Sequence, residues 1–329
     1  MINVLIQCKY ANNTAYNFIY GDWGIVSEID QLSATGALRS YSKYNFPAAA
    51  TALSDTPTYT TKTVFDGVNT ASWNYAGTKS GLLVSAMAVT DSAGVTTTTN
   101  LYTSGWQTGL VYYVTRSNGA TNYRTTTNSW SYESTSLSYA LNPRIDSVST
   151  TLNDSGQSSA VNYTYTANGN VSQVQEFDYG GLARTTQTDY LTTSAYLTQH
   201  ILDRPSQVRV YNAAGTLLAR TDFAYDSGVL MTVAPSSGHD NAAYGSAFTT
   251  RGNPATVTRY PNLPSTTPSI VRNFSFDTAG NLLIAQVDCC NLEQWTFGSE
   301  TQYAYPASTI RGPGGGPQLT TTMVYDFDT

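Results

Sequence analysis

Apolar and polar residues alternate with a period of two along much of the chain, which is the pattern of β-strands. Clear runs are Leu110–Val114, Val208–Tyr211 and Thr321–Tyr325. The 3.6-residue period of helices is nearly absent, and only the short run Phe46–Leu53 reads as a helical turn. We therefore expect an all-β protein.

One short phrase occurs three times and joins such strands in pairs. Residues Tyr163–Val171 return as Phe274–Leu282, and a looser copy is Tyr211–Leu217. In each copy an aromatic residue leads into Asp, Asn or Thr, then Gly, then an aliphatic residue. This order predicts a strand, a tight turn and a second strand, which make a β-hairpin.

The residue types of the phrase suit a hairpin turn. Gly169, Gly215 and Gly280 can adopt the positive φ that a tight turn requires, and an Asp or Asn before them can bond the backbone in an Asx-turn. Aromatic residues at i and i+2, such as Phe274 and Phe276, lie on one face of a strand. We expect these rings to form a ladder with the next copy.

Weaker copies of the turn extend into both halves of the chain, at residues 33–38, 65–68, 91–95, 116–119, 153–156, 225–229 and 249–253. Many of the glycines in these turns, counted from Gly67, are separated by near multiples of about 12 or 13 residues, the length of two short strands with their turns. A repeated unit of this size packs against its neighbours rather than around a private core. We expect the function to reside in an extended surface or shell, not in one catalytic cleft.

Composition and charge exclude several classes of protein. Only 12% of the residues are charged, 40% are hydrophobic and 25 are Tyr, so disorder is excluded. The net charge is −6 with no basic face, which argues against nucleic-acid binding. No apolar run approaches the roughly 20 residues of a membrane span. The opening Met1–Gln7 is not a signal peptide, so either export uses another route or Met1 is not the natural start.

Residues that could carry chemistry have simpler structural roles. His200 is expected to pack at a strand end and His239 to lie in a solvated loop, since no nucleophile elbow accompanies either. The glycine-rich run Arg311–Pro317 lacks the Lys and Ser/Thr of a phosphate loop and predicts a hairpin loop. The carboxylates that stand out cap turns: Asp91, Asp154, Asp226 and Asp277. We expect no catalytic residue and no cofactor.

The cysteines and the tryptophans each allow a structural and a functional interpretation. Cys8 and the adjacent Cys289 and Cys290 form no disulfide framework, and with no His nearby the pair is expected to be buried thiols without a metal. The tryptophans and many tyrosines could form a platform for stacking sugars. The five tryptophans are Trp23, Trp73, Trp106, Trp130 and Trp295.

The repeated phrase resembles that of the RHS/YD-repeat family. The likeness is carried by Tyr163–Val171, Tyr211–Leu217, Tyr225–Val229 and Phe274–Leu282, and is clearest over residues 150–329. Thr166 stands where the family has Asp, and Thr216 where it has Asn. The resemblance implies β-hairpins that wind as a spiral sheet into a hollow shell, as in large secreted or surface proteins of bacteria, some of which enclose a toxin.

We thus expect residues 1–329 to be one segment of such a β-shell, cut at both ends, because Val324–Thr329 opens another copy. The function expected is a non-catalytic scaffold or container for a toxin or cargo domain, with the rest of the shell as partner. The alternatives are an adhesin that binds a glycan or a cell-surface protein, and a β-rich glycoside hydrolase. The residues expected at the repeat turns are Tyr165, Gly169, Asn170, Tyr211, Gly215, Tyr225, Asp226, Gly228, Gly252, Asn253, Phe276, Asp277, Gly280 and Asn281.

Overall fold

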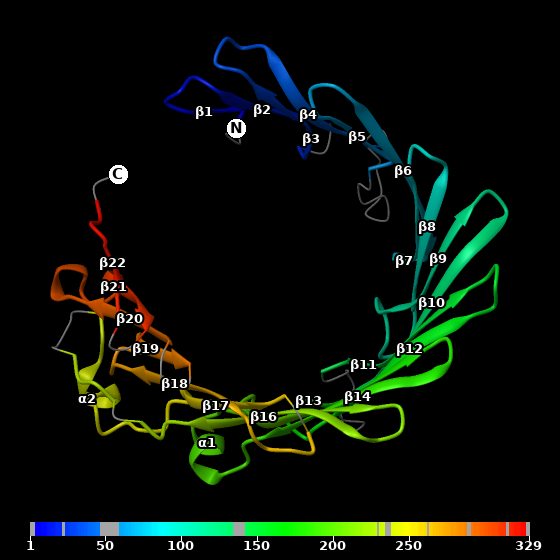
Figure 1. The fold of residues 1–329 in the computed structure, drawn as a ribbon. Coiled ribbons are helices and arrows are strands. Elements are labelled where there is room, and N and C mark those ends of the chain that lie inside the picture. Colours follow the sequence, from blue (N-terminus) through cyan, green and yellow to red (C-terminus); the bar gives the residue numbers. More distant parts are fainter. Residues whose placement is uncertain are drawn as a thin grey trace. The chain divides into compact units, whose positions relative to one another are not determined.

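The computed structural model of the chain describes residues 4–21, 24–46, 59–133, 142–228, 230–233, 238–261, 263–287, 291–313 and 316–326 (Figure 1). Several sequence predictions fall outside these ranges: most of the helical turn at 46–53, Trp23, Val229, the pair Cys289 and Cys290, and the last residues of the closing strand.

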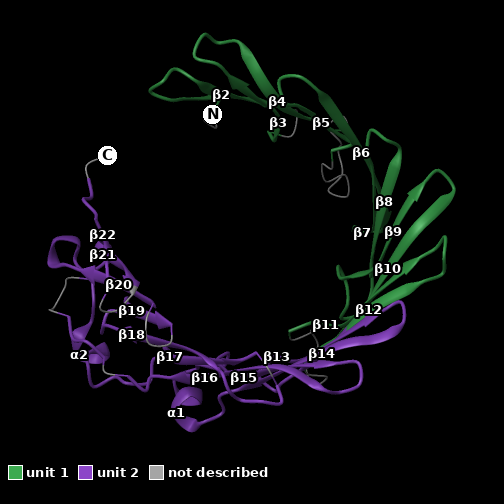
Figure 2. Ribbon diagram, in the orientation of Figure 1, with its two compact units in different colours: residues 1–161 green, residues 162–329 purple. Residues whose placement is uncertain are grey.

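The described residues form an all-β fold with 22 strands and two short helices. The chain divides into two compact units, residues 1–161 and 162–329 (Figure 2), and we describe each by itself. The predicted all-β class built of antiparallel hairpins is confirmed. That the chain is one continuous repeat segment stays a prediction.

In unit 1 each strand pairs antiparallel with the next one in the chain, from β1 to β11. The strands are β1 (Gln7–Lys9), β2 (Ala15–Tyr20), β3 (Val26–Leu32), β4 (Leu38–Asn45), β5 (Thr61–Phe65), β6 (Thr70–Ser80), β7 (Leu83–Thr90), β8 (Val95–Leu101), β9 (Val111–Asn118), β10 (Thr121–Ser131) and β11 (Arg144–Leu152). Strand β12 (Ser158–Tyr165) contains the unit boundary.

In unit 2 each strand likewise pairs antiparallel with the next one in the chain, from β13 to β22. Its strands are β13 (Val171–Asp178), β14 (Gly181–Tyr190), β15 (Pro205–Asn212), β16 (Leu217–Tyr225), β17 (Pro254–Tyr260), β18 (Ile270–Phe276), β19 (Leu282–Val287), β20 (Asn291–Phe297), β21 (Pro306–Pro313) and β22 (Leu319–Thr322). Two helices, α1 (Ser194–Thr198) and α2 (Asn241–Tyr244), and a 3₁₀ turn η2 (Ser299–Thr301) lie in the connections. No helix among the described residues is long and apolar enough to cross a membrane.

The sheet has almost no buried core. Among the described residues, Ala15 and Ala255 are the only hydrophobic side chains that are buried. Threonine and serine hydroxyls instead pair across neighbouring strands, as in Thr90–Thr96 at 2.8 Å and Thr126–Thr150 at 3.1 Å. Stability therefore comes from contacts between neighbouring strands rather than from a central apolar cluster, as repeat architectures require.

Five of the described turns share one hydrogen-bond scheme, which we call the corner. A corner is a run of five residues whose first side-chain oxygen accepts a bond from the fifth N–H, at 2.8–3.2 Å. The first N–H donates to the fifth carbonyl, and the fourth residue is a glycine with φ between 78° and 89°. The corners are residues 33–37, 91–95, 166–170, 212–216 and 277–281.

The predicted ring ladder between copies of the phrase stays a prediction. In unit 2 the ring contacts given by the structure join Tyr196 to Tyr225 and Tyr305 to Tyr325, among others. These contacts link residues in connections to residues at or beyond strand ends. The hydroxyl of Tyr225 also donates to the carbonyl oxygen of Pro205 at 2.9 Å, across the open end of the hairpin of β15 and β16.

The corner predicts the effect of adding a side chain at its glycine. Gly280 has φ of 89° with nothing within 4 Å of an added Cβ, so Gly280→Ala should lower stability through backbone strain alone, by about 1–2 kcal/mol. Gly180 is equally open but lacks a positive φ, so Gly180→Ala is the matched control and should cost nothing. Urea unfolding midpoints measure both. Equal midpoints for the two variants would contradict the role given to the corner glycine.

Candidate functional site: the tied edge of unit 2

In an antiparallel meander, the connections that follow even-numbered strands all lie along one edge, the edge formed by the ends of the strands. In unit 2 this edge carries the corners 166–170 and 277–281 and the longer connections 191–204, 226–253 and 298–305. We call these five connections the tied edge. It contains most of the buried polar residues described, including Asp277 and Thr278, each only 1% exposed.

The longest connection is a corner split in two. Asp226 N–H donates to the carbonyl of Asn253 at 2.9 Å, and Asn253 N–H donates to the Asp226 carboxylate at 3.0 Å. Asp277 and Asn281 form the same two bonds, at 3.0 and 2.8 Å. Gly252, with φ of 71°, occupies the place of the corner glycine. Residues 227–250 are therefore an insertion within one corner.

This arrangement corrects the prediction of two separate tight turns at 225–229 and 249–253. Gly228 does not adopt a positive φ, and Asp226 itself takes φ of 53°. The reason is electrostatic: the Asp226 carboxylate accepts three successive backbone N–H groups, from Arg251, Gly252 and Asn253, at 2.8–3.0 Å. A carboxylate gains more from these donors than from one local Asx-turn.

Tyr196 completes the surroundings of Asp226. Its hydroxyl, from helix α1, donates to the Asp226 carboxylate at 3.0 Å. Burial, with the adjacent Asp226 charge, raises the pKa of Tyr196 to about 12. The phenol therefore stays a neutral donor at any physiological pH, which suits a fixed structural contact.

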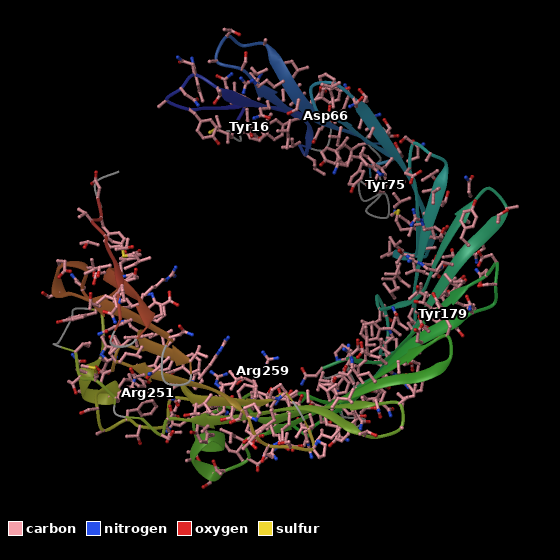
Figure 3. All side chains as sticks on the ribbon, in the orientation of Figure 1. Tyr16, Asp66, Tyr75, Tyr179, Arg251 and Arg259 are labelled. Carbon is pink, nitrogen blue, oxygen red and sulfur yellow. The ribbon has the colours of Figure 1, made fainter. Side chains whose placement is uncertain are left out.

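Arg251 organises the insertion. Its guanidinium donates to the carbonyls of Phe248 and Gly245, at 2.8 and 2.9 Å, and also to that of Tyr244. It stacks on the Phe248 ring at 5.3 Å, beside helix α2 (Figure 3). Asp240 caps the start of the helix, because its carboxylate accepts the backbone N–H groups of Ala242 and Ala243. Four carbonyl acceptors, with Thr278 as the fourth, use most of the donors that one arginine has.

Side chains tie each connection on this edge to the next. Asn170 donates to the Leu202 carbonyl at 2.5 Å, and Arg204 donates to the Gly252 carbonyl at 2.8 Å. These bonds join the corner 166–170 to the connection 191–204, and that connection to the split corner.

The ties continue beyond the split corner. Arg251 donates to the Thr278 carbonyl at 2.9 Å, and Asn281 donates to the Tyr303 carbonyl at 2.9 Å. Met231 adds a short parallel bridge to Asp277. The five connections are thus joined by hydrogen bonds from one end of the edge to the other.

A hollow of about 160 Å³ lies between the insertion and strands β17 and β18. Its lining includes Leu230, Arg251, Phe274 and Phe276. The hydroxyl of Ser275, also in the lining, is buried without a hydrogen-bond partner among the described residues. The lining also includes the polar residues Asp226, Ser246, Thr249 and Asn253.

The other predicted residues lie as follows. Tyr165 and Phe276 end the strands before their corners, and Tyr211 and Gly215 belong to the hairpin of β15 and β16. His239 bonds Asn241 at 2.7 Å in the insertion. His200 is exposed after α1 with φ of 55°, so the expectation of strand-end packing was wrong: the short helix α1, not a strand, precedes it.

Outside the tied edge, two carboxylates lie close together on β3, those of Glu28 and Asp30. On β3, burial and the neighbouring Glu28 raise the pKa of Asp30, whereas Glu28 is paired with Lys43 at 3.0 Å. No group of three or more His, Cys, Asp and Glu side chains that could hold a metal occurs within the described ranges. The sequence analysis did not identify Arg204 and Arg251 as site residues. The sequence carries a signal of this edge in the Asn that ends its corners, at positions 170 and 281.

The split corner predicts a large effect at Asp226. Asp226→Ala leaves three backbone donors and the Tyr196 hydroxyl without their acceptor, so we expect a loss of about 2–4 kcal/mol in the unfolding free energy. Asp203→Ala is the control, because its carboxylate is 67% exposed and bonds only the adjacent Arg204. Urea unfolding gives the free energies, and a loss at Asp226 no larger than at Asp203 would contradict the scheme.

Comparisons with known proteins give no family. No protein-family model matches the chain, and no curated protein matches it. Among solved structures, the chain is similar to a porin-like protein from Bacteroides uniformis, with 12% identity over 83% of this chain and 87% of that one and a TM-score of 0.29. It is also similar to TcdB2-TccC3, with 10% identity over 95% of this chain and a TM-score of 0.27. The chain spans 19% of that TcdB2-TccC3 chain.

Proposed function

We propose that this chain is a non-catalytic segment of a β-shell of the RHS/YD-repeat type. The shell would scaffold or enclose a toxin or other cargo domain of a secreted or cell-surface bacterial protein. The observation that carries the proposal is the recurring corner, including its split form, with the phrase of the family in place. No residue is assigned a catalytic role.

The construction of the sheet supports a container. Hydrogen bonds close the backbone between successive strands, and the tied edge closes the connections of unit 2. A wall of this kind excludes solutes by its continuity and needs no reactive group. Only 12% of the residues are charged, which fits the many Tyr and Thr contacts along the strands.

The exposed outermost described strands support the proposal that further strands of the shell are the partner of this chain. Strand β22 pairs only with β21 among the described strands, and all of its residues are exposed. Leu319 in β22 and Val324 after it are 79% and 95% exposed, and Leu5 and Ile6 before β1 are 60% and 68% exposed. Unpaired strand edges with apolar residues are sites where more strands add.

The test is the full reading frame and its product. We expect more copies of the aromatic–Asp–x–x–Gly–Asn phrase beside this segment, followed by an unrelated domain. In limited proteolysis of the complete protein, that domain should resist a protease that digests it when it is produced alone. Flanking sequence without repeats, or equal digestion of the domain in both forms, would contradict the container.

A second candidate, the glycan-binding adhesin, has one observation in its favour. Tyr44, Lys62 and Trp73 are cross-strand neighbours on one face of β4, β5 and β6. The Lys62 ammonium lies 5.7 Å from the Tyr44 ring and 5.9 Å from the Trp73 ring. The rings of Tyr59 and Tyr75, the latter labelled in Figure 3, meet edge to face with centroids 4.6 Å apart. Half-buried rings of this kind can stack on sugars.

Glycan-array binding distinguishes this candidate. If the adhesin reading holds, Trp73→Ala should abolish binding, whereas Trp106→Ala, at a ring pair with Tyr132 elsewhere in unit 1, should leave it unchanged. Absence of any glycan hit for the wild type would exclude the candidate.

A further inference from the structure

Two arginines on one face of unit 2 have no acidic partner among the residues that the structure describes. Arg259 on β17 lies opposite Ile270 on β18, so Arg259, Ile270 and Arg272 share a face of the sheet. Both arginines are exposed, and Figure 3 shows Arg259 on the inner side of the curve of unit 2. Neither forms an ion pair within the described residues. Five other arginines of unit 2 do: Arg184, Arg204, Arg209, Arg220 and Arg311.

A hollow of about 350 Å³ begins at Arg272 and crosses to β21 on the same face. Apolar residues Phe274, Ala285 and Val287 contribute to its lining. Arg311 stands at the far side, paired with Glu293 at 2.5 Å. The hollow therefore combines an apolar floor with Arg272 on one side and the Arg311–Glu293 ion pair on the other.

These exposed charges are available to an external partner. Arg259 and Arg272 lie diagonally across two strands and repel each other, and neither is paired with a carboxylate of the described residues. Guanidinium groups bind carboxylates through two parallel hydrogen bonds. The chain as a whole carries a net charge of −6, so this cationic area is local.

We propose that Arg259, Arg272 and the hollow beside them bind a polypeptide segment in which carboxylate side chains alternate with apolar or aromatic ones. The apolar floor favours a peptide over a polyanion without apolar groups. The proposal rests on the container function, and it names the chemistry by which the inner face would hold its cargo.

Fluorescence anisotropy on the whole chain tests the proposal. The probe is a labelled Glu-Phe-Glu-Phe-Glu-Phe peptide, and the comparison peptide has Gln in place of every Glu. We expect saturable binding of the acidic probe, weaker as salt rises, and at least tenfold weaker binding by Arg259→Gln/Arg272→Gln. Lys9→Gln/Arg39→Gln is the control, because it removes two charges from unit 1 and should leave binding unchanged.

Three results would overturn the proposal: no saturable binding of the acidic probe, equal binding of the Gln peptide, or equal loss in the control variant. Polygalacturonate that displaces the probe and binds with the same arginine dependence, but more tightly, would reassign the site to acidic glycans. Failure here leaves the protease-protection test of the container untouched, since a wall can enclose cargo without binding it.

Discussion

The structure depends on one type of hydrogen bond. In it, the side-chain oxygen of the first corner residue accepts the backbone N–H of the fifth, which directly follows the corner glycine. The bond turns a strand back on its neighbour within five residues, and it tolerates Ser, Thr, Asn or Asp as the acceptor. Because almost no hydrophobic side chain of the described residues is buried, such local closures replace the core of an ordinary domain. A sheet of this kind can extend by adding hairpins, since an added hairpin does not need a hydrophobic core of its own.

The split corner shows how the repeat accepts insertions. The Asp226 carboxylate and the Gly252 backbone reproduce the closure of a continuous corner although residues 227–250 lie between them. Arg251 then fastens the insertion to the neighbouring corner through the Thr278 carbonyl. Long connections on the tied edge can therefore vary in length while the strands they join keep their register.

The all-β class could be predicted from the sequence, because alternation is a local signal, although the predicted strand at Thr321–Tyr325 ends at Thr322 in the structure. The sequence did not predict that 225–229 and 249–253 are halves of one corner, since the bond that joins them spans the insertion. Helices α1 and α2 are four or five residues long, too short to show a helical period, and α2 depends on the Asp240 cap and on Arg251. The Arg204 and Arg251 ties end on backbone carbonyls, which leave no mark in the sequence.

The most direct test of this account is native-state hydrogen exchange along the tied edge. If the side-chain ties join the connections into one structure, the amides of residues 170, 251–253, 278 and 281 should exchange with the same opening free energy as the central strands of unit 2. Exchange of these amides at the rate of exposed loops, while the strands remain protected, would contradict it.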